Sequence, residues 1–261
     1  MFSFSTEVTS SSIRSDNALY KRTLKAYHLI SKKTHGDVLE IGCGEGYGLD
    51  IIIKNTKSLT VIDKSKYTLN KIKKRYKKVT IINQRIPPLK NLKDNSFDVV
   101  VSFQVIEHIK DATLFINEIH RVLKPNGTAY ITTPNSKKSI ARNPWHYKEY
   151  NYSEIKSLIE QKFINYCIKG IKGNKKTDSY YSKNKRSVER LLQLDVFKIQ
   201  HIIPAFLLKL PYEIVNRFNR ARLFKKNNAL VNSITLEDYS LDDYSTDTLD
   251  FFCTMNKKDI L

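Results

Sequence analysis

VLEIGCGEGYG, at residues 38–48, is the stretch that decides the fold class of this chain. It begins as a short apolar run, which is typical of a strand buried in a parallel sheet, and it continues into a cluster of glycines. Gly42, Gly44, Gly46 and Gly48 are four of only eight glycines in 261 residues. Glycine lets the backbone turn sharply and approach a ligand closely, so the stretch predicts a ligand-binding turn between a strand and a helix.

An acid follows this turn at the spacing expected for a nucleoside site. Asp63 ends the next apolar run, SLTVID, 21 residues after Gly42, where a carboxylate can bind two ribose hydroxyls. A dinucleotide fingerprint, G-x-G-x-x-G, would need glycine at position 47, which is Tyr47. The pattern therefore favours a nucleoside ligand without a pyrophosphate.

Strands and helices alternate from the glycine turn to residue 133. An amphipathic helix is expected over 16–33, and Asp111 is a suitable N-cap for a later one. Alternation of this kind predicts an α/β fold with a Rossmann-like, doubly wound sheet. The expected strands are 37–42, 58–63, 79–82, 97–103 and 127–133, the expected helices are 47–54, 65–76 and 111–123, and 124–127 (KPNG) is expected to be a turn.

The second half of the chain is less regular. A helix at 152–160 and a strand at 163–171 are followed by about 75 residues before a final strand at 248–256, too long a gap for a plain loop. Apolar residues at helical spacing predict two helices there, with Pro204 and Pro211 as helix openers. The acidic segment 237–250 is expected to be an exposed loop. The predicted divisions are an N-terminal helical segment (1–36), a core domain (37–171 with 246–261), a helical cap insert (172–245), and expected cap helices near 186–200 and 205–224.

Composition narrows the location and the partners. No apolar run is long enough to cross a membrane, and residues 1–12 lack the pattern of a secretory signal. Cys43, Cys167 and Cys253 fit neither a disulfide framework nor a metal signature, so we expect a reducing cytoplasm and no metal. The net charge of +19 favours anionic partners, but 34 Lys against 11 Arg is a weaker sign of nucleic-acid binding than an arginine excess would be.

Four motifs together resemble a known family: VLEIGCGEGYG, TVID, FDVVVSFQVIEHI and RVLKPNGTAYITTPN. They are similar to the successive motifs of class I S-adenosylmethionine-dependent methyltransferases, in the branch of the ubiquinone-type O-methyltransferases. The resemblance implies a seven-stranded sheet with an antiparallel last strand, and S-adenosylmethionine as the cofactor. Glu40 and the loop from Gly42 through Cys43 to Gly44 would hold its methionine part, Asp63 with the adjacent Lys64 its ribose, and Gln104 would lie near its sulfonium end.

Two positions near the expected cofactor site need separate treatment. The family often has a Gly-Asp-Ala step after the third strand, where this chain has Asn83 and Gln84; either amide can accept the adenine hydrogen bond. In the N-terminal helix, Arg22 and Tyr27 are expected to close over the cofactor carboxylate. The alternative for both is a solvated helix face.

Two histidines are candidates for the general base that a hydroxyl nucleophile needs. His108 lies in IEHI and His146 in NPWHYKEY, both just beyond strands whose carboxyl ends should meet at one sheet edge. The alternatives are a structural histidine bonded to loop backbone for His108, and a loop anchor for His146. Residues 103–106 read FQVI, and the absence of an Asn-Pro-Pro-Tyr-like motif there argues against methylation of an adenine amino group.

These observations lead to one main expectation and two alternatives. The expected function is S-adenosylmethionine-dependent O-methylation of a small molecule, a lipid-linked intermediate or a glycan. The high positive charge keeps an RNA methyltransferase open, and the altered third-strand motif keeps open a cofactor-binding protein without turnover. The cap is expected to fold over the carboxyl edge of the sheet as a wall of the acceptor pocket, and its basic, amphipathic second helix could also lie on an anionic membrane surface.

Overall fold

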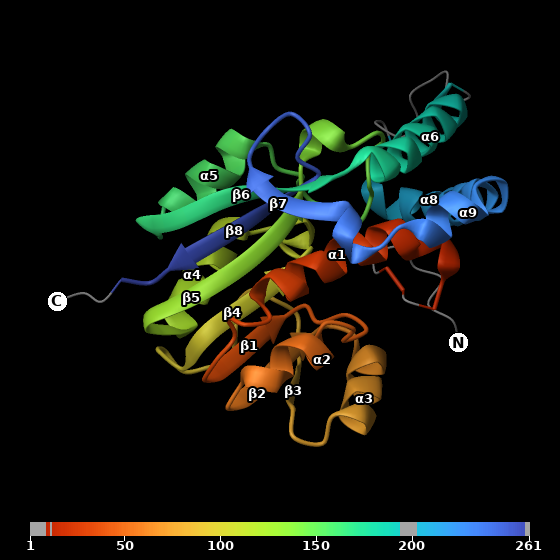
Figure 1. Cartoon of the computed structure of the whole chain (residues 1–261). Coiled ribbons are helices and arrows are strands. Elements are labelled where there is room, and N and C mark those ends of the chain that lie inside the picture. The colour runs from red at the N-terminus through yellow and green to blue at the C-terminus, as the bar shows by residue number, and fades with distance from the viewer. Residues whose placement is uncertain (1–8, 11, 194–202, 259–261) are drawn as a thin grey trace.

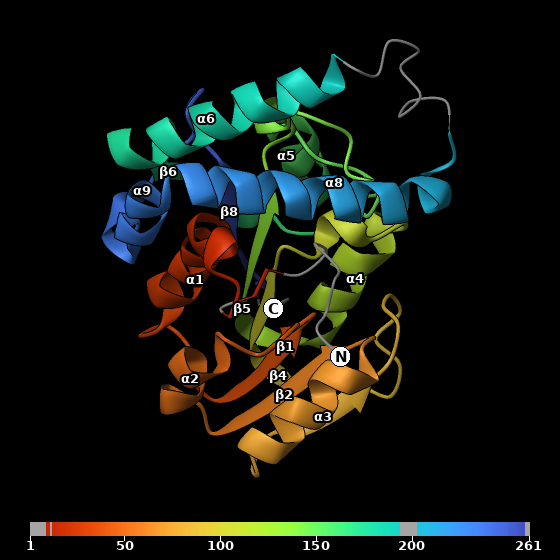
Figure 2. The ribbon, with the colours of Figure 1, turned by 90° about the vertical axis from the view of Figure 1, so that its right-hand side faces the viewer.

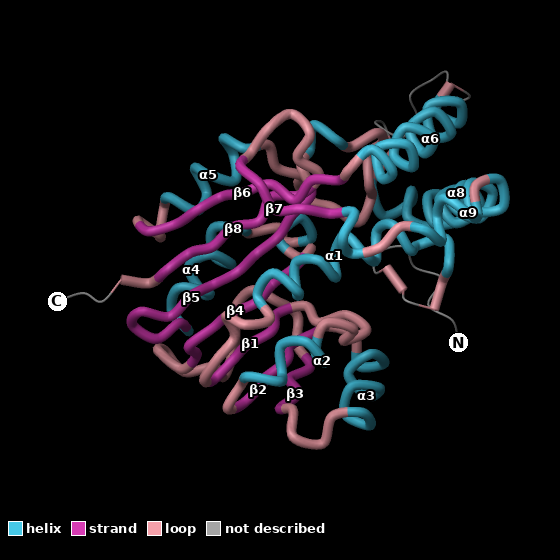
Figure 3. Tube along the Cα trace, viewed as in Figure 1, coloured by secondary structure: helices cyan, strands magenta, loops and turns pink. Residues whose placement is uncertain are grey.

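The computed structural model describes residues 9–10, 12–193 and 203–258, which form one mixed eight-stranded sheet with helices on both faces (Figures 1 and 3). The strand order is β3-β2-β1-β4-β5-β8-β6-β7. A Rossmann-like α/β fold is thereby confirmed. The strands are β1 Asp37–Ile41, β2 Ser58–Asp63, β3 Thr80–Asn83, β4 Phe97–Phe103, β5 Leu123–Pro134, β6 Asn165–Gly173, β7 Tyr239–Asp243 and β8 Asp250–Asn256.

The half of the sheet from β3 to β5 is parallel throughout. Its central strands are continuous apolar runs because both faces are covered: Val38, Leu39 and Ile41 of β1 have no exposed surface. Since the strands are parallel, the loops that follow β1, β2, β3, β4 and β5 all emerge at one edge of the sheet. This carboxyl edge faces the viewer in Figure 2 and positions the candidate site.

Two apolar layers hold helices against the sheet. On one face, α4 (Ala112–Val122) and α5 (Tyr152–Glu160) pack on one cluster of buried side chains. The other face is covered by α1 (Asn17–Ile30), α2 (Leu49–Ile52) and α3 (Lys66–Arg75). The predicted N-cap is confirmed, since the Asp111 Oδ1 accepts a hydrogen bond of 2.9 Å from the Leu114 N–H.

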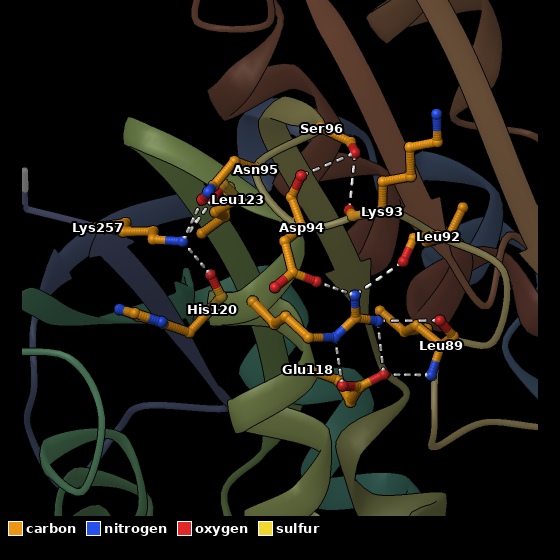
Figure 4. Close-up of polar contacts among 11 residues, drawn as sticks. Leu89, Leu92, Lys93, Asp94, Asn95, Ser96, Glu118, His120, Leu123 and Lys257 are labelled. Atoms are coloured by element: carbon orange, nitrogen blue, oxygen red, sulfur yellow. Dashed lines mark hydrogen bonds and ion pairs between the residues drawn. The ribbon is translucent and has the colours of Figure 1, made fainter.

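A network of polar contacts fastens the loop between β3 and β4 to α4 (Figure 4). The Arg121 guanidinium donates to the Glu118 carboxylate, to Asp94 and to the carbonyls of Leu89 and Leu92, with distances of 2.7 to 3.0 Å. Glu118 in turn accepts the Leu89 N–H at 2.6 Å. One side chain thus closes a long connection at the end of the sheet opposite to the carboxyl edge.

The prediction of seven strands is wrong, because the segment 237–250 is not an exposed loop. Residues Tyr239–Asp243 form β7, which pairs with β6 in antiparallel register. Asp238 and Asp250, two of the acids that suggested a loop, are buried. Charge composition misled the prediction here because each of these acids has a cationic partner far away in the sequence, Lys176 for Asp238 and Arg22 for Asp250.

The expected antiparallel last strand is confirmed. β8 lies between β5 and β6 and runs antiparallel to both, pairing Thr128 with Asn256 and Ile171 with Asp250. The tetrapeptide 124–127, expected to be a turn, is instead an excursion within β5, where the register against β4 shifts. Asn126 at φ 63° provides the left-handed backbone for that shift.

The segment 172–245 contains α6 (Lys175–Leu192), α8 (Ala205–Lys226) and α9 (Asn228–Ser233), and it also adds β7 to the sheet. The first cap helix begins earlier than 186, and the part of it expected at 194–200 lies outside the described residues. Pro204 opens α8 as expected, but Pro211 lies inside that helix. Figure 2 shows α6 and α8 side by side across the carboxyl edge. Among the described helices, none combines the length and the apolar character that crossing a bilayer requires.

Candidate functional site

The loop after β1 has the strained backbone that its glycines predict. Gly42, Gly44 and Gly46 all have positive φ, between 49° and 76°. A Cβ atom on Gly42 would lie 2.5 Å from Val105 Cγ2, and one on Gly48 would lie 2.1 Å from the Tyr27 ring. The close approach of backbone and side chains therefore excludes larger residues from this loop.

Asp63 fixes this loop from the neighbouring strand. Its Oδ2 accepts the Gly44 N–H at 3.0 Å and its Oδ1 accepts the Ser65 N–H at 2.7 Å. The carboxylate thus joins the loops after β1 and β2 at the carboxyl edge. Asn83 pairs with Asp63 across β2 and β3, so the predicted ribose and adenine positions are neighbours.

Glu40 is a buried carboxyl that points to a cationic ligand. The Tyr27 hydroxyl donates to its Oε1 at 2.6 Å, whereas its Oε2 is buried without a hydrogen-bond partner among the described residues. Burial raises the pKa of Glu40 to about 8, even though the Tyr27 hydrogen bond lowers it. An ammonium group such as that of the cofactor's methionine part fits this oxygen, since it supplies both a donor and the missing charge.

Aromatic rings line the same region. Tyr27 stands edge-on to Tyr47 and to Phe103, with ring centroids 5.9 and 4.8 Å apart, and Tyr20 packs edge-on against Tyr47 at 5.1 Å. Burial raises the pKa of Tyr47 to about 12, so its hydroxyl stays protonated. The residue that breaks the dinucleotide fingerprint is therefore part of an apolar wall that covers the glycine loop.

The other predicted cofactor positions have more limited means of binding. Cys43 is buried, and because burial raises the pKa of its thiol, only its backbone is suited to a ligand. Lys64 is exposed. The Asn83 amide donates to the Asp63 and Lys64 carbonyls, and the Gln84 amide donates to the Pro88 carbonyl. The oxygen of each amide is thus the atom oriented to accept from an adenine amino group.

Arg22 is not on a solvated face, and neither is Tyr27; that alternative is wrong for both. The Arg22 Nε lies 2.9 Å from Asp250 Oδ2, and both side chains are almost fully buried. Neither that nitrogen nor either Asp250 oxygen has a hydrogen bond of good geometry within the described part of the chain. Burial raises the pKa of Asp250, which Arg22 and Gln104 partly offset. These under-bonded groups are suited to a polar ligand at the carboxyl edge.

Gln104 stands at the end of β4 with an unusual backbone. Its φ is 57°, a left-handed value that few residues other than glycine adopt, and its side chain donates to the Thr132 hydroxyl at 3.2 Å. Strain of this kind is commonly found at functional sites. The structure therefore places Gln104 where the sequence predicts it, at the carboxyl edge between β1 and β5.

The two candidate histidines meet beyond this edge. Their rings are perpendicular, with centroids 4.8 Å apart. His108 Nδ1 lies 2.9 Å from the Trp145 carbonyl, and His146 Nδ1 lies 2.6 Å from the Glu149 carboxylate. A carbonyl or a carboxylate can only accept, so each Nδ1 carries the proton.

Glu149 and Asn143 complete the surroundings of His146. Burial alone would raise the pKa of Glu149, but hydrogen bonds from His146 and Ser139 outweigh it and hold that pKa below its usual range. The Asn143 amide nitrogen lies 2.9 Å from His146 Nε2, and the Trp145 N–H fixes its orientation by donating to Asn143 Oδ1. Sequence reasoning missed both residues, although the His-x-x-Glu spacing from 146 to 149 was a readable signal.

Glu107 is buried directly behind the histidines. Its Oε2 accepts from the Thr133 hydroxyl at 3.0 Å, and burial raises its pKa to about 7. Ligand-capable atoms of Glu107, His108 and His146 lie within 4.8 Å of one another, as a divalent cation would require. Both ring nitrogens of His146 already have hydrogen-bond partners, however, so we assign no metal to the cluster.

Two hollows open beside His146. One, of about 380 Å³, is lined by Arg142, Asn143, His146 and Glu149 among others. A wider groove of about 950 Å³ runs between the beginnings of α4 and α5 and shares Tyr147 and Lys148 with the first. The histidine cluster thus faces a space that can admit a small molecule.

Comparison with known proteins agrees with this geometry. Residues 39–131 match the family model described as a methyltransferase domain. A probable S-adenosylmethionine-dependent methyltransferase of Mycolicibacterium smegmatis is 36% identical over 160 residues, covering 59% of this chain and 62% of the relative. A ubiquinone biosynthesis O-methyltransferase of Pelagibacter ubique is 34% identical over 100 residues, covering 38% and 42%. Each match spans less than two thirds of the relative's own length.

A solved structure extends the comparison to the fold of nearly the whole chain. A methyltransferase from Thermotoga maritima, described as a possible histamine N-methyltransferase, superposes with a TM-score of 0.57 over 94% of this chain and 91% of its own, at 14% identity. The likeness at that identity concerns the fold alone. With the family match and the relatives, it shows that the chain contains a methyltransferase domain of the class I S-adenosylmethionine-dependent family.

Proposed function

We propose that this protein transfers the methyl group of S-adenosylmethionine to a hydroxyl group of a small molecule, a lipid-linked intermediate or a glycan, in the cytoplasm. The observation that carries the proposal is the contact between His146 and the ionised Glu149 beside an open hollow. The name of the Pelagibacter relative, an O-methyltransferase, supports transfer to oxygen. The unpaired, exposed Cys167 is consistent with a reducing compartment.

The residues at the carboxyl edge suit the cofactor. Glu40 Oε2 would accept from its amino group, the backbone from Gly42 to Gly44 would line its methionine part, and Asp63 would accept from its ribose. When bound, the cofactor supplies an electrophilic methyl group on sulfur. Arg22 would face its carboxylate, which requires the guanidinium to turn away from Asp250.

His146 is placed to remove the acceptor proton. Its Nδ1–H is held by Glu149, so its Nε2 carries the lone pair that now accepts from the Asn143 amide. That amide N–H marks the position from which an acceptor O–H would donate. As the acceptor oxygen bonds to the methyl carbon and the sulfur–carbon bond breaks, the hydroxyl proton passes to Nε2, and Glu149 stabilises the resulting imidazolium.

The test uses methyl-tritiated cofactor and an extract of the source cells, divided into a filtrate of small molecules, a lipid extract, total RNA and protein. We expect acid-stable label in the filtrate or the lipid extract. His146→Ala should lower the rate by about 100-fold or more, the usual range for a general base, while the dissociation constant for the cofactor stays unchanged. His35→Ala, at an exposed histidine, is the matched control.

Two results would contradict the proposal. Label confined to RNA would indicate an RNA methyltransferase, the alternative that the charge of +19 left open. Tight cofactor binding with no label in any fraction would indicate a binding protein without turnover. Full activity of the His146→Ala variant would leave O-methylation possible but would remove His146 as its base.

A further inference from the structure

The solvent-facing side of α8 is apolar, contrary to what its surroundings predict for a surface helix. Phe206, Leu210 and Phe218 have 70%, 71% and 63% of their surface exposed. Folded proteins rarely expose several large apolar side chains side by side unless the patch binds something. We define the outer stripe of α8 as Phe206, Leu207, Leu210, Ile214, Val215 and Phe218.

The opposite side of α8 is polar and buried. Glu213 accepts from the Trp145 indole N–H at 2.7 Å, and Asn219 accepts from the Ser187 hydroxyl at 2.5 Å. Arg217 and Arg220 both pair with Asp16, a carboxylate with no exposed surface, at 2.8 and 3.0 Å. The usual arrangement, with apolar residues inward and polar residues outward, is thus inverted along much of this helix.

These inward contacts fix the direction of the outer stripe. Turning α8 so that Phe206 or Phe218 became buried would expose or unpair Glu213 and the ion pairs to Asp16, which is costly for buried charged groups. Lys209 adds a further contact, with its ammonium 4.1 Å from the centre of the Trp145 ring. The apolar face therefore points outward because of specific contacts on the other side.

Positive charge lies next to the outer stripe. Arg222, Lys225 and Lys226 are exposed in the last part of α8, directly after Phe218. The stripe from residue 206 to 218 is about 18 Å long at the rise of an α-helix. A row of large apolar side chains followed by exposed cations is the pattern of a helix that lies in the interface of an anionic bilayer.

We propose that α8 binds the surface of an anionic lipid bilayer through its outer stripe, with Arg222, Lys225 and Lys226 contacting lipid phosphates. α8 also contacts the loop that carries His146, through Glu213 and Trp145. Membrane binding would therefore hold the candidate site next to the bilayer surface, where a lipid-linked acceptor is available. The choice of acceptor depends on the function proposed above, but binding to lipid does not.

The experiment measures co-sedimentation of the full chain, without cofactor or acceptor, with vesicles of two compositions. We expect binding to vesicles that contain about one third phosphatidylglycerol, and little binding to pure phosphatidylcholine, since phosphate contacts alone cannot distinguish a basic patch from a true anionic surface preference. The triple variant Phe206→Ser, Leu210→Ser, Phe218→Ser should bind at least 10-fold more weakly. The emission of Trp145, the single tryptophan, checks that α8 remains in place.

Matched variants separate apolar insertion from charge. Tyr67→Ser with Ile164→Ser removes exposed apolar side chains elsewhere and should leave binding unchanged. Changing the three cations after the stripe to Gln should weaken binding at least 10-fold, whereas the same change at three exposed lysines of α3 should not. These two sets are Arg222, Lys225 and Lys226, and Lys71, Lys73 and Lys74.

Three results would overturn the proposal. The wild-type protein would remain in the supernatant with phosphatidylglycerol vesicles at low salt, or the serine variant would bind as tightly as the wild type. The third is a dimer in light scattering that the serine variant abolishes, which would make a second copy of the chain the occupant of the stripe. Because no methyl transfer is measured, a failure here is distinct from a failure of the proposed function.

Discussion

The parallel and antiparallel halves of the sheet differ in how far apart along the chain their partners lie. In the parallel half, β1 pairs with β2 from Asp37 to Ser58, about 20 residues on. In the antiparallel half, Thr128 of β5 pairs with Asn256 of β8, and Arg22 meets Asp250. The cofactor residues belong to the first half, and most of the unexpected contacts belong to the second. Short-range order therefore carries the binding chemistry, and long-range pairing determines what closes over it.

The largest effect is expected in the parallel half, from Asp63→Ala. The variant loses the acceptor of the Gly44 and Ser65 N–H groups as well as the proposed ribose contact. We expect the cofactor to bind about 100-fold more weakly, as measured by isothermal titration calorimetry, because hydrogen bonds to a charged group are lost. Asp242→Ala, at an exposed acid of β7, should bind normally. Equal affinities of the two variants would remove Asp63 from the site.

A smaller effect, on stability, is expected from Arg121→Ala. Five hydrogen bonds from one guanidinium hold the loop between β3 and β4 on α4. We expect the free energy of unfolding to fall by about 3 kcal/mol in urea titrations, because charge-assisted hydrogen bonds are the strong ones. The control is Arg75→Ala, at an exposed ion pair with Asp50, which should change stability by less than about 1 kcal/mol.

In the antiparallel half, Asp238→Asn should cost about 2 kcal/mol of stability, since the carboxylate accepts from Thr235 N–H, Asn174 and Lys176. Burial alone would raise the pKa of Asp238, but these contacts lower it to about 2. A depressed pKa in the folded state stabilises the protein above the unfolded value near pH 4, and this contribution is lost as the pH falls toward 2. The difference between wild type and variant should therefore disappear in acid.

The readout that sharpens the comparison is cofactor binding by the same Asp238→Asn protein. If the two halves are as separate as their contacts suggest, its affinity for the cofactor at pH 7 should equal that of the wild type. A loss of 10-fold or more would show that β7 and its neighbours support the cofactor site directly. Asp243→Asn, at an exposed end of β7, is the control for both measurements.

No effect is expected from removal of divalent cations. We expect the rate of methyl transfer to be the same before and after treatment with EDTA and gel filtration, because His146 is engaged by Glu149 and Asn143. If the rate falls and Mg²⁺, Mn²⁺ or Zn²⁺ restores it, the cluster of Glu107, His108 and His146 is a cation site. His146 would then be a ligand and not a base.

Most of the parallel half could be predicted because its signals are local. A buried strand followed by glycines, an acid at the next strand end and the Asp111 N-cap each depend on residues within a few turns of one another. The same holds for the acid at position 63. Each of these features follows from backbone chemistry that neighbouring residues determine, so periodicity and spacing were sufficient.

The remaining features depend on contacts that spacing does not contain. Nothing near Asp250 in the sequence indicates that Arg22 will neutralise it, and an acidic segment without lysine resembles a solvated loop until Lys176 and Asn174 are placed beside Asp238. Likewise, the apolar residues of α8 predicted a buried stripe, because helical spacing gives the face but not its direction. The polar contacts of Glu213 and Arg217 reverse that direction.

The position of β8 has a consequence for how the protein is made. β6 and β7 reach the rest of the sheet only through β8, although β8 is translated after both. While the ribosome is still adding residues 174–249, β5 has an open edge and β6 has no place in the sheet. An unpaired strand edge is a template for aggregation, so the nascent chain is vulnerable until residues 250–256 leave the exit tunnel. The cell must then protect a half-formed sheet whose cofactor loop, between β1 and α2, has long been synthesised.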